Sequence, residues 1–250
     1  MEFSFLKNPS VLKIFNLFES ENAKIYMVGG AVRNELLGIK ATDFDFATPL
    51  KPDDVVKILS KEKIPMDLKG IKFGCVTAIV DDIKMDITTF RKELYTKKTR
   101  FPKIEYSTKI SDDYIRRDFT VNAIYVDATG KIIDLGEGLE DLKNGVLKFI
   151  IHPKKSIYFD PLRLFRYFRF CSLYFYKNFD KRSLEFCLSR FQKIRKDISR
   201  YKIKEEMNKI LSGDGVNVIL NIWRDSGLLY ELDTYLDRNQ LDLTRGIKNE

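Results

Sequence analysis

The sequence predicts an α+β fold in which a head of mixed strands and helices is followed by an all-helical part. Short runs rich in β-branched and aromatic residues, which are typical of strands, occur only in the first half of the chain. From about residue 139 onward, long helical patterns replace them. The chain has 250 residues, 44% of them hydrophobic, which suffices for one large or two small domains with a buried core.

The head is expected to contain a mixed sheet with short helices between its strands. Gly29 and Gly30 follow the first strand and open a helix, and Pro52 lies near the start of another. Residues 92–111 are polar and basic over a long stretch, which is typical of a functional or mobile loop. Strands are expected at 24–28, 43–47, 74–80, 83–90 and 123–127, and helices at 10–18, 31–37 and 52–60.

The second part is expected to be helical throughout. Gly213 and Gly215 are natural helix terminators between its last two helices. Helices are expected at 160–176, 181–191, 200–212 and 214–224. We therefore divide the chain into a head (1–137), a neck (138–212) and a shortened helical body (213–250).

The positive charge of the chain is concentrated in the neck. The net charge is +8, yet residues 148–212 alone carry 17 Lys and Arg against 6 Asp and Glu. Twelve Phe and Tyr residues lie between Tyr158 and Phe191. Cations neutralise phosphates and rings stack on unpaired bases, so this mixture suits an RNA partner. A helical core with solvated lysine faces explains the same composition, and charge alone does not decide between the two.

Several classes of protein are excluded by simple patterns. No apolar run approaches the ~18 residues that a membrane-spanning helix needs, and the N-terminus has no signal-peptide core. Three cysteines without CxxC spacing predict neither a disulfide framework nor a zinc site. His152 is the only histidine, which excludes a phosphohydrolase centre of the HD type. We expect a cytoplasmic protein that is a monomer or a weak dimer.

Three acidic residues are expected to meet on one face of the predicted sheet. Asp43 and Asp45 are two positions apart in a strand and point to the same side, while the phenylalanines beside them point to the core. Asp86 lies in another strand between two apolar residues. Neighbouring carboxylates repel each other unless a cation lies between them, and Mg²⁺ prefers oxygen ligands. Such a set can hold two Mg²⁺ ions ~4 Å apart, which activates a hydroxyl and steadies a leaving pyrophosphate.

The segment VGGAVRNELLGIKATDFDFAT (28–48) resembles the signature of the class II tRNA nucleotidyltransferases (CCA-adding enzymes) and the related bacterial poly(A) polymerases. The resemblance covers roughly residues 24–212 and implies a nucleotidyltransferase head of the polymerase β-like type. It continues in order through RRDFTVNAIYVD (116–127), GLEDLKNGVLKFI (138–150), FDPLRLFRYFRF (159–170) and ISRYKIKEEMNKIL (198–211).

The resemblance also implies a role for each matching residue. Asp43 and Asp45 would bind the metal ions, and Asp86 would complete the catalytic carboxylates. A salt-bridged helix start is the alternative explanation for residues 116–122. The implied nucleotide contacts are Gly29, Gly30 and Arg33 on the triphosphate, Asp118 and Asn122 on the ribose, and Arg116 or Arg117 on a phosphate.

The segment 159–170 carries a pattern that suits recognition of a base. A carboxylate accepts a hydrogen bond from the amino group of cytosine or adenine, whereas uracil and guanine direct a lone pair toward it. Asp160 and Arg163 would thus select C and A without a nucleic acid template, and an ion pair within a helix is the alternative. On one continuous helix Asp160, Arg163, Arg166 and Arg169 would fan across one side, opposite an apolar stripe of Leu164, Phe165, Phe168 and Cys171.

Three positions depart from the pattern of the family. Phe159 and Tyr201 stand where Glu is usual, and Asn34 stands where Asp is common. We expect a template-independent, Mg²⁺-dependent enzyme that adds CMP and AMP from CTP and ATP to the tRNA 3′ end. A CC-adding enzyme, an A-adding enzyme and a poly(A) polymerase remain alternatives. So does a non-catalytic RNA-binding protein, although clustered carboxylates beside RNA phosphates argue against it.

Overall fold

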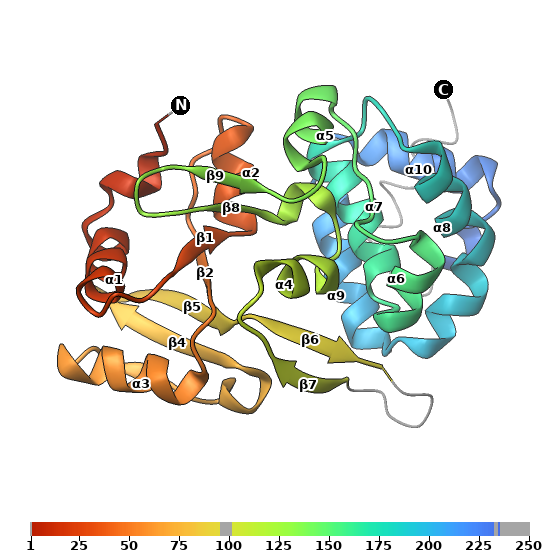
Figure 1. The fold of residues 1–250 in the computed structure, drawn as a ribbon. Coiled ribbons are helices and arrows are strands. Elements are labelled where there is room, and N and C mark those ends of the chain that lie inside the picture. The colour runs from red at the N-terminus through yellow and green to blue at the C-terminus, as the bar shows by residue number, and fades with distance from the viewer. Residues whose placement is uncertain (1, 96–101, 233–234, 236–250) are drawn as a thin grey trace. The chain divides into compact units, whose positions relative to one another are not determined.

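The computed structural model describes residues 2–95, 102–232 and 235, and the chain divides into two compact units (Figure 1). The first unit comprises residues 1–142 and the second residues 143–250. The first is a mixed α/β unit and the second is helical, so the predicted fold class is confirmed. The finer division into head, neck and body stays a prediction.

The first unit is built on a mixed sheet of seven strands in its described part, in the order β3-β4-β5-β2-β1-β8-β9. Neighbouring strands are antiparallel except β2 and β5, which pair in parallel. The strands are β1 (Tyr26–Val28), β2 (Phe44–Thr48), β3 (Met66–Asp67), β4 (Cys75–Val80), β5 (Ile83–Thr89), β8 (Ile124–Val126) and β9 (Ile132–Asp134). The five strands expected from the sequence are among them.

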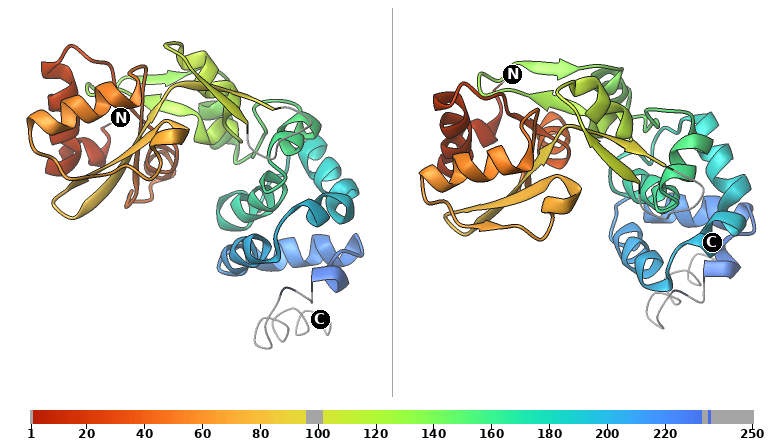
Figure 2. Two further views of the ribbon diagram at one scale, coloured as in Figure 1. Left: turned by 90° about the horizontal axis from the view of Figure 1, so that it is seen from below. Right: turned by 60° about the horizontal axis from the view of Figure 1, so that its bottom comes forward.

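Three helices cover one face of this sheet (Figure 1 and Figure 2). They are α1 (Pro9–Ser20), α2 (Gly30–Leu36) and α3 (Pro52–Lys61). Asn8 caps α1 by accepting hydrogen bonds from the backbone N–H groups of Ser10 and Val11, and proline occupies the first turn of α1 and of α3. Phe44 and Phe46 of β2 are buried beneath the helices, as their alternation with the acids predicts.

On the opposite face of the sheet, the described residues form a small apolar cluster around β1 and β8. There Val28, Phe90 and Tyr125 pack with residues of α4 (Ile110–Arg116). Elsewhere this face carries the polar side chains of β2, β4 and β5. One face of the sheet therefore forms the core, and the other holds the predicted acidic residues.

Parts of the expected loop at 92–111 are regular structure, so the prediction of one continuous loop is wrong. Strands β6 (Arg91–Leu94) and β7 (Lys103–Tyr106) form an antiparallel pair, and α4 begins at Ile110. The alternation of polar and apolar residues in KIEY fits a half-exposed strand, but the high charge of the segment hides it. Residues 96–101 lie outside the described part of the chain.

The second unit is a bundle of short helices. The apolar stripe predicted on α7 is confirmed, because Leu164, Phe165, Phe168 and Cys171 are at most 1% exposed. The ring of Phe168 meets that of Trp223 edge to face. After α5 (Gly138–Asn144), which crosses from one unit to the other, the helices are α6 (Pro153–Phe159), α7 (Arg163–Tyr174), α8 (Lys181–Ile194), α9 (Arg200–Leu211), α10 (Val216–Asp225) and α11 (Leu229–Leu232).

The predicted helix at 160–176 is interrupted at its start. Helix α6 ends at Phe159, Asp160 is extended (φ −139°, ψ 102°), and α7 begins only at Arg163. Pro161 explains the break, since a residue before proline is disfavoured in the helical region. Asp160 therefore does not share a helix with Arg163, Arg166 and Arg169, and that expectation is wrong.

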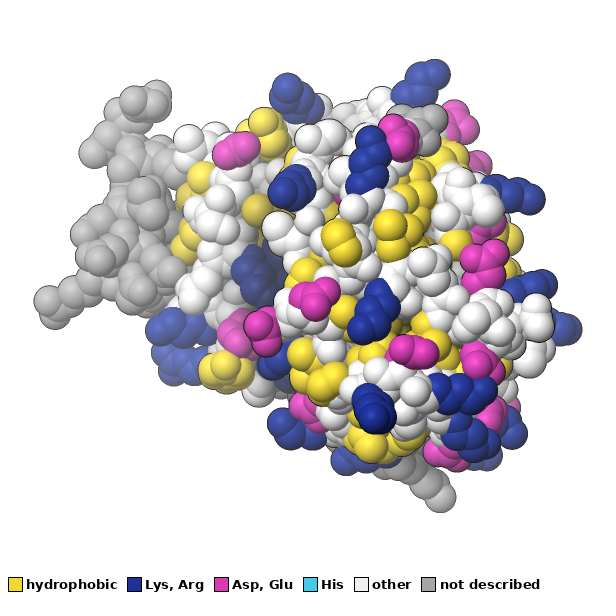
Figure 3. Space-filling view, turned by 90° about the vertical axis from the view of Figure 1, so that its left-hand side faces the viewer, with side chains coloured by type: hydrophobic (Ala, Val, Ile, Leu, Met, Phe, Trp, Pro, Cys, Tyr) yellow, Lys and Arg dark blue, Asp and Glu magenta, His cyan; other side chains and the backbone are white. Residues whose placement is uncertain are grey.

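Half of the twelve aromatic rings between Tyr158 and Phe191 belong to the core. Phe165, Tyr167, Phe168, Phe170, Phe175 and Phe191 are at most 5% exposed, whereas most of the cations around them are exposed. The composition is thus explained largely by a helical core with solvated cationic faces. On the face of the first unit around α1 and α3, by contrast, Lys and Arg are interspersed with Asp and Glu (Figure 3). No helix in the described part of the chain is both long enough and apolar enough to cross a membrane.

The turn between α9 and α10 supplies a test of this packing. A Cβ atom on Gly213 would meet the Ser172 hydroxyl and lie 2.6 Å from the Ser172 carbonyl oxygen on α7. Gly213→Ala should therefore lower the free energy of unfolding by about 1–3 kcal/mol, because backbone must move to make room. Urea denaturation followed by circular dichroism measures the difference.

Ser212→Ala is the matched control for this change. Ser212 is exposed and its hydroxyl donates only to the carbonyl of Lys209, so the control should change stability by less than about 0.5 kcal/mol. Equal stability of the Gly213 variant and the wild type would contradict the close approach of the turn to α7.

Candidate active site

A single row of residues runs across five strands on the open face of the sheet. Because positions in register point to the same side, the side chains of this row are neighbours. Asp45 and Asp86 stand beside each other in the parallel β2–β5 pair, and Thr77 donates a hydrogen bond of 2.5 Å to Asp86 Oδ1. The row consists of Thr77 (β4), Asp86 (β5), Asp45 (β2), Val28 (β1) and Tyr125 (β8).

The three predicted catalytic acids influence one another. Asp43 is exposed at the bend that precedes β2, two positions before Asp45. Burial raises the pKa of Asp45 to about 6, with further increases from the charges of Asp43 and Asp86, and Arg117 opposes the shift. In the part of the chain that the structure describes, no three acidic, His or Cys side chains already converge as a metal-binding group. The acids thus form a site of concentrated negative charge.

Gly29 keeps the space beside these acids open. It has a φ of +80°, which favours glycine. A Cβ atom at this position would lie 3.5 Å from Asp45 Oδ2 and 3.9 Å from Arg117 Nη1. The glycine, a carboxylate and a guanidinium therefore converge at the end of β1. Gly30 follows as the first residue of α2.

The two arginines of RRDFT have different surroundings. Arg117 donates from Nε to Asp113 Oδ2 at 2.9 Å and lies over the ring of Tyr125. Arg116 donates from Nε to the other oxygen of Asp113 at 2.8 Å, and its Nη1 lies 3.7 Å from Glu93 on β6. Arg117 thus lies near Gly29 and influences Asp45 electrostatically.

The predicted ribose and phosphate residues form one buried network. Arg33 donates from Nη1 to Asn122 Oδ1 at 2.6 Å, and Asn122 donates from Nδ2 to Asp118 Oδ1 at 3.1 Å. Each of these three residues is 6% exposed. Asn34 accepts from Arg33 Nε and Nη2, so its amide oxygen takes the position of an acceptor where the family commonly has Asp. The network joins α2 to the segment that precedes β8.

In the second unit, the candidate base-reading residues lie at the junction of α6 and α7. Asp160 Oδ1 accepts from the backbone N–H of Leu162 at 3.0 Å, which stabilises the turn. Arg163 is buried and donates from Nη1 to the hydroxyl of Ser156 at 2.9 Å. Asp160 precedes α7 and Arg163 begins it, so the two remain close in the chain.

The other two arginines of α7 lie against an aromatic ring. The guanidinium carbon of Arg166 is 5.7 Å, and that of Arg169 4.5 Å, from the ring centre of Phe170. Arg169 also forms a 2.9 Å ion pair with Glu206 of α9, and both side chains are largely buried. These contacts join α7 to α9 and give Arg169 a packing role that its spacing did not indicate.

Sequence reasoning missed several residues that support the site. Asp113 lies four positions before Arg117, which is a spacing for ion pairs on a helix, but no helix was predicted between residues 111 and 116. Tyr125 resembles any aromatic residue in a strand, and its hydroxyl partner is visible only in the fold. Thr77 becomes recognisable only through its register with Asp86.

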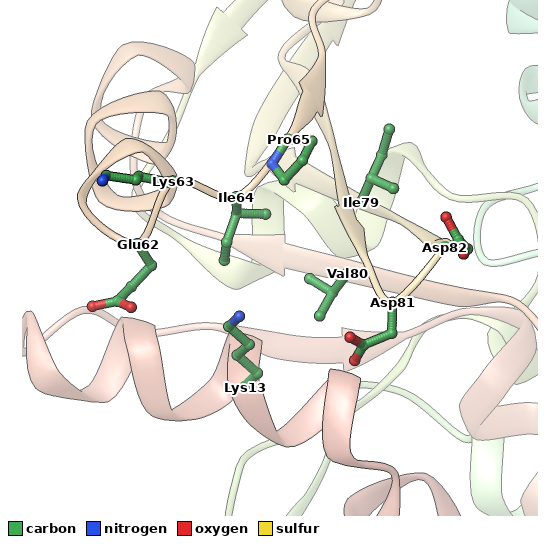
Figure 4. Close-up of a pocket in the computed structure, with 9 residues that line it drawn as sticks. All are labelled: Lys13, Glu62, Lys63, Ile64, Pro65, Ile79, Val80, Asp81 and Asp82. Carbon is green, nitrogen blue, oxygen red and sulfur yellow. The ribbon is translucent and has the colours of Figure 1, made fainter.

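A cavity of about 270 Å³ lies elsewhere in the first unit (Figure 4). Lys13 of α1, the segment after α3 and the β4–β5 turn line it, and none of the predicted site residues contributes. It is distinct from the face that carries Asp45 and Asp86.

The sequence of the chain is similar to a known family and to several characterised proteins. Residues 25–148 match the family model of the poly A polymerase head domain. The CCA tRNA nucleotidyltransferase 1, mitochondrial, of Mus musculus is 32% identical over 251 residues, covering 99% of this chain and 57% of the relative. The CCA-adding enzyme of Ligilactobacillus salivarius is 38% identical over 162 residues, covering 64% and 39%.

A solved structure shows the same likeness. The CCA-adding enzyme of Bacillus stearothermophilus, in complex with CTP, superposes with a TM-score of 0.77 at 28% identity over 91% of this chain and 53% of that chain. The present chain thus spans 57% of the length of the mouse relative and 53% of that of the Bacillus stearothermophilus enzyme. The head-domain match, the sequence identity and the fold agree, and the chain belongs to the family of tRNA nucleotidyltransferases and poly(A) polymerases that share this head.

Proposed function

We propose that the chain transfers CMP and AMP from CTP and ATP to the 3′ end of tRNA and so builds the CCA terminus. The observation that carries the proposal is the row in which Asp45 and Asp86 lie side by side next to Gly29 and Arg117. Relatives named as CCA-adding enzymes match the chain, and one similar structure is a complex with CTP.

The acidic residues fit a magnesium ion. Mg²⁺ is usually bound by one or two carboxylates together with waters and substrate phosphates, so Asp45 and Asp86, assisted by Asp43, form a suitable donor set. When bound, the ion favours loss of the proton from the RNA 3′-hydroxyl and neutralises the departing pyrophosphate. The chain itself contributes the alignment of the two carboxylates and the open space at Gly29.

Arg117 and the buried network would divide the remaining contacts with the nucleotide. Arg117 has hydrogen bonds through Nε, which leaves its terminal nitrogens beside Asp45 and Gly29 to receive phosphate oxygens, together with the backbone of Gly30. Arg33 is bound to Asn122, which suits it to orient Asn122 toward the ribose. Asp118 holds the same amide from its other side.

In the second unit, Asp160 and Arg163 would select the base. The Asp160 carboxylate accepts from the amino group of cytosine or adenine, and the guanidinium donates to the adjacent ring nitrogen. Ser156 fixes the direction of Arg163, which restricts the geometry that a base must satisfy. Exposed cations of α8 and α9 would bind RNA phosphates, so affinity should fall steeply as salt rises.

The alternatives differ in the product. A CC-adding or A-adding enzyme would use the same carboxylates and stop at another length. A poly(A) polymerase is favoured as a second candidate by the family model, which is named for the head of that enzyme. A non-catalytic RNA-binding protein would gain nothing from adjacent carboxylates on the open face of the sheet.

The proposed function is tested with three tRNA transcripts that end at the discriminator base, at C and at CC. Each is incubated with the chain, Mg²⁺ and single or mixed nucleoside triphosphates, and products are sized at single-nucleotide resolution. We expect addition of C, C and A followed by a stop. Termination after CC, addition of only the last A, or a long A tail would identify one of the alternatives, and retained RNA binding without any extension would contradict catalysis.

Replacement of Asp45 tests the charge at the catalytic site. Asp45→Asn should lower nucleotide transfer by about 100-fold or more, since it removes a proposed metal ligand. The folded state raises the pKa of Asp45 from 3.8 to about 6, so the ionised group costs stability as pH rises through that interval. Without metal, the variant should be more stable than the wild type by about 2–3 kcal/mol at pH 8, and the two should converge below about pH 4.

Thermal unfolding at both pH values, with and without Mg²⁺, measures this effect. Mg²⁺ should stabilise the wild type and not the variant. Glu19→Gln, an exposed residue of α1, is the charge-matched control and should behave as the wild type. Lower stability of the Asp45 variant at pH 8 would contradict a raised pKa of Asp45 in the folded state.

Replacement of Asp160 tests base selection. Asp160→Ala should reduce the preference for CTP and ATP over UTP and GTP by about 10-fold, because the acceptor for the amino group is lost. Steady-state incorporation of each nucleotide provides the ratio. Asp214→Ala removes an exposed carboxylate of the same unit and should leave the ratio unchanged. An unaltered preference in the Asp160 variant would reject its role in reading the base.

A further inference from the structure

We propose that Asp113 and Tyr125 are positioning residues that hold the Arg117 guanidinium at the nucleotide phosphates. The inference rests on the proposed function and adds to it two residues outside the predicted site. It also distinguishes Arg117 from Arg116, which the sequence left as equal candidates.

Asp113 is the centre of a buried ionic cluster. It is 0% exposed, and each of its carboxylate oxygens has two donors. Oδ1 accepts from Arg116 Nε at 2.8 Å, and Nη2 of the same arginine forms an ion pair with it at 2.5 Å. Oδ2 accepts from Arg117 Nε at 2.9 Å and from the Tyr125 hydroxyl at 2.8 Å. The carboxylate thus fixes Arg117 by its inner nitrogen and leaves the outer end of the guanidinium directed elsewhere.

Tyr125 sets where that outer end lies. Its hydroxyl also accepts from Arg117 Nε at 3.2 Å, and its ring lies beneath the guanidinium with 5.4 Å between ring centre and Cζ. Tyr125 stands in the same row as Asp45, separated from it only by Val28 of β1. Tyr125 and Asp45 are two strand spacings apart, which amounts to ~10 Å. The Arg117 side chain, anchored at Tyr125, extends across this distance toward Asp45.

The contacts at Gly29 show that Arg117 reaches this place. Arg117 Nη1 and Asp45 Oδ2 both lie within 4 Å of the position that a Gly29 Cβ atom would fill. Neither terminal nitrogen of Arg117 has a hydrogen bond with another residue of the described chain. A guanidinium group that is fixed in position and always charged is well suited to bind phosphate oxygens next to the Asp45 carboxylate and the Gly29 backbone.

Arg116 is held differently, although it shares the same carboxylate. It has two contacts with Asp113, and a third charge, Glu93, lies on its other side. Arg91 pairs with the same Glu93 oxygen at 3.0 Å. Arg116 is therefore part of the link between α4 and the β6–β7 pair.

The ionisation state of Asp113 supports its role as an anchor for Arg117. Burial would raise the pKa of Asp113, but Arg117 and Arg116 hold it below its usual value, so the carboxylate is ionised throughout the neutral range. An ionised, buried acceptor orients its donors firmly, because no water competes for it. A flexible arginine would lose conformational entropy on binding phosphate, and this anchor has already restricted it.

The test uses Asp113→Asn, which keeps the shape and removes the charge, and Tyr125→Phe, which removes only the hydroxyl. The full 250-residue chain is titrated with inorganic pyrophosphate and with ATP by calorimetry, and KM and kcat for CTP and ATP are measured in the extension assay. Glu93→Gln is the matched control, since it removes a carboxylate that pairs with Arg116 and not with Arg117. Thermal unfolding of each variant separates loss of affinity from loss of fold.

We expect Asp113→Asn to weaken pyrophosphate binding and to raise KM for both nucleotides by about 10-fold, and Tyr125→Phe by about 3-fold. Glu93→Gln should stay within about twofold of the wild type. In a double-mutant cycle, Asp113→Asn combined with Arg117→Ala should bind pyrophosphate no more weakly than Arg117→Ala alone, because Asp113 acts through Arg117.

Wild-type affinity in both positioning variants, or additive losses in the cycle, would overturn the inference. If Asp113→Asn does not fold, the pyrophosphate affinity of Tyr125→Phe and the double-mutant cycle of Tyr125→Phe with Arg117→Ala test the inference by the same criteria. A wild type that binds neither pyrophosphate nor ATP and extends no RNA would instead reject the proposed function, and the inference with it.

Discussion

The parallel pairing of β2 with β5 brings Asp45 and Asp86 into one row, and the repulsion between these carboxylates is the constraint on which the site depends. The same two strands bury Phe44, Phe46, Met85 and Ile87 on their other face, so the acids cannot turn away without exposing the core. Packing thus holds like charges together, and burial, with a further contribution from the charges of Asp43 and Asp86, raises the pKa of Asp45. A divalent cation bound there, as we propose, would relieve this repulsion and couple the stability of the head to its chemistry.

The other parts of the first unit are arranged around that row. Gly29 leaves space at its edge, Arg117 brings a positive charge to the same place, and α2 carries Arg33 toward Asn122. Each contact joins elements far apart in the sequence. In the second unit, Pro161 separates α6 from α7 and leaves Asp160 extended at a helix start. Buried rings form the core of that unit, while its cations remain at the surface.

Much of the head could be predicted from the sequence because its strands are amphipathic with a period of two. The alternation around Asp45 and Asp86 identified both strands, the face of each acid and the buried partners. Register could not be predicted, so the adjacency of Tyr125 and Asp45 across Val28 became visible only in the structure. The strands β6 and β7 were missed because a half-exposed charged hairpin lacks an apolar face. The break at Asp160 was missed because the three-residue recurrence of charge outweighed the local effect of proline.

The central claim is that the Asp45–Asp86 row is a divalent-cation site, and iron-mediated cleavage tests it most directly. Fe²⁺ is bound in place of Mg²⁺, ascorbate and peroxide generate hydroxyl radicals at the metal, and the fragments of the chain are mapped by mass spectrometry. We predict cuts next to Asp43, Asp45 and Asp86 that excess Mg²⁺ suppresses and that are absent from Asp86→Ala. Cleavage confined to other acidic positions, such as the Asp81–Asp82 turn, or cleavage that Mg²⁺ does not suppress, would contradict the account.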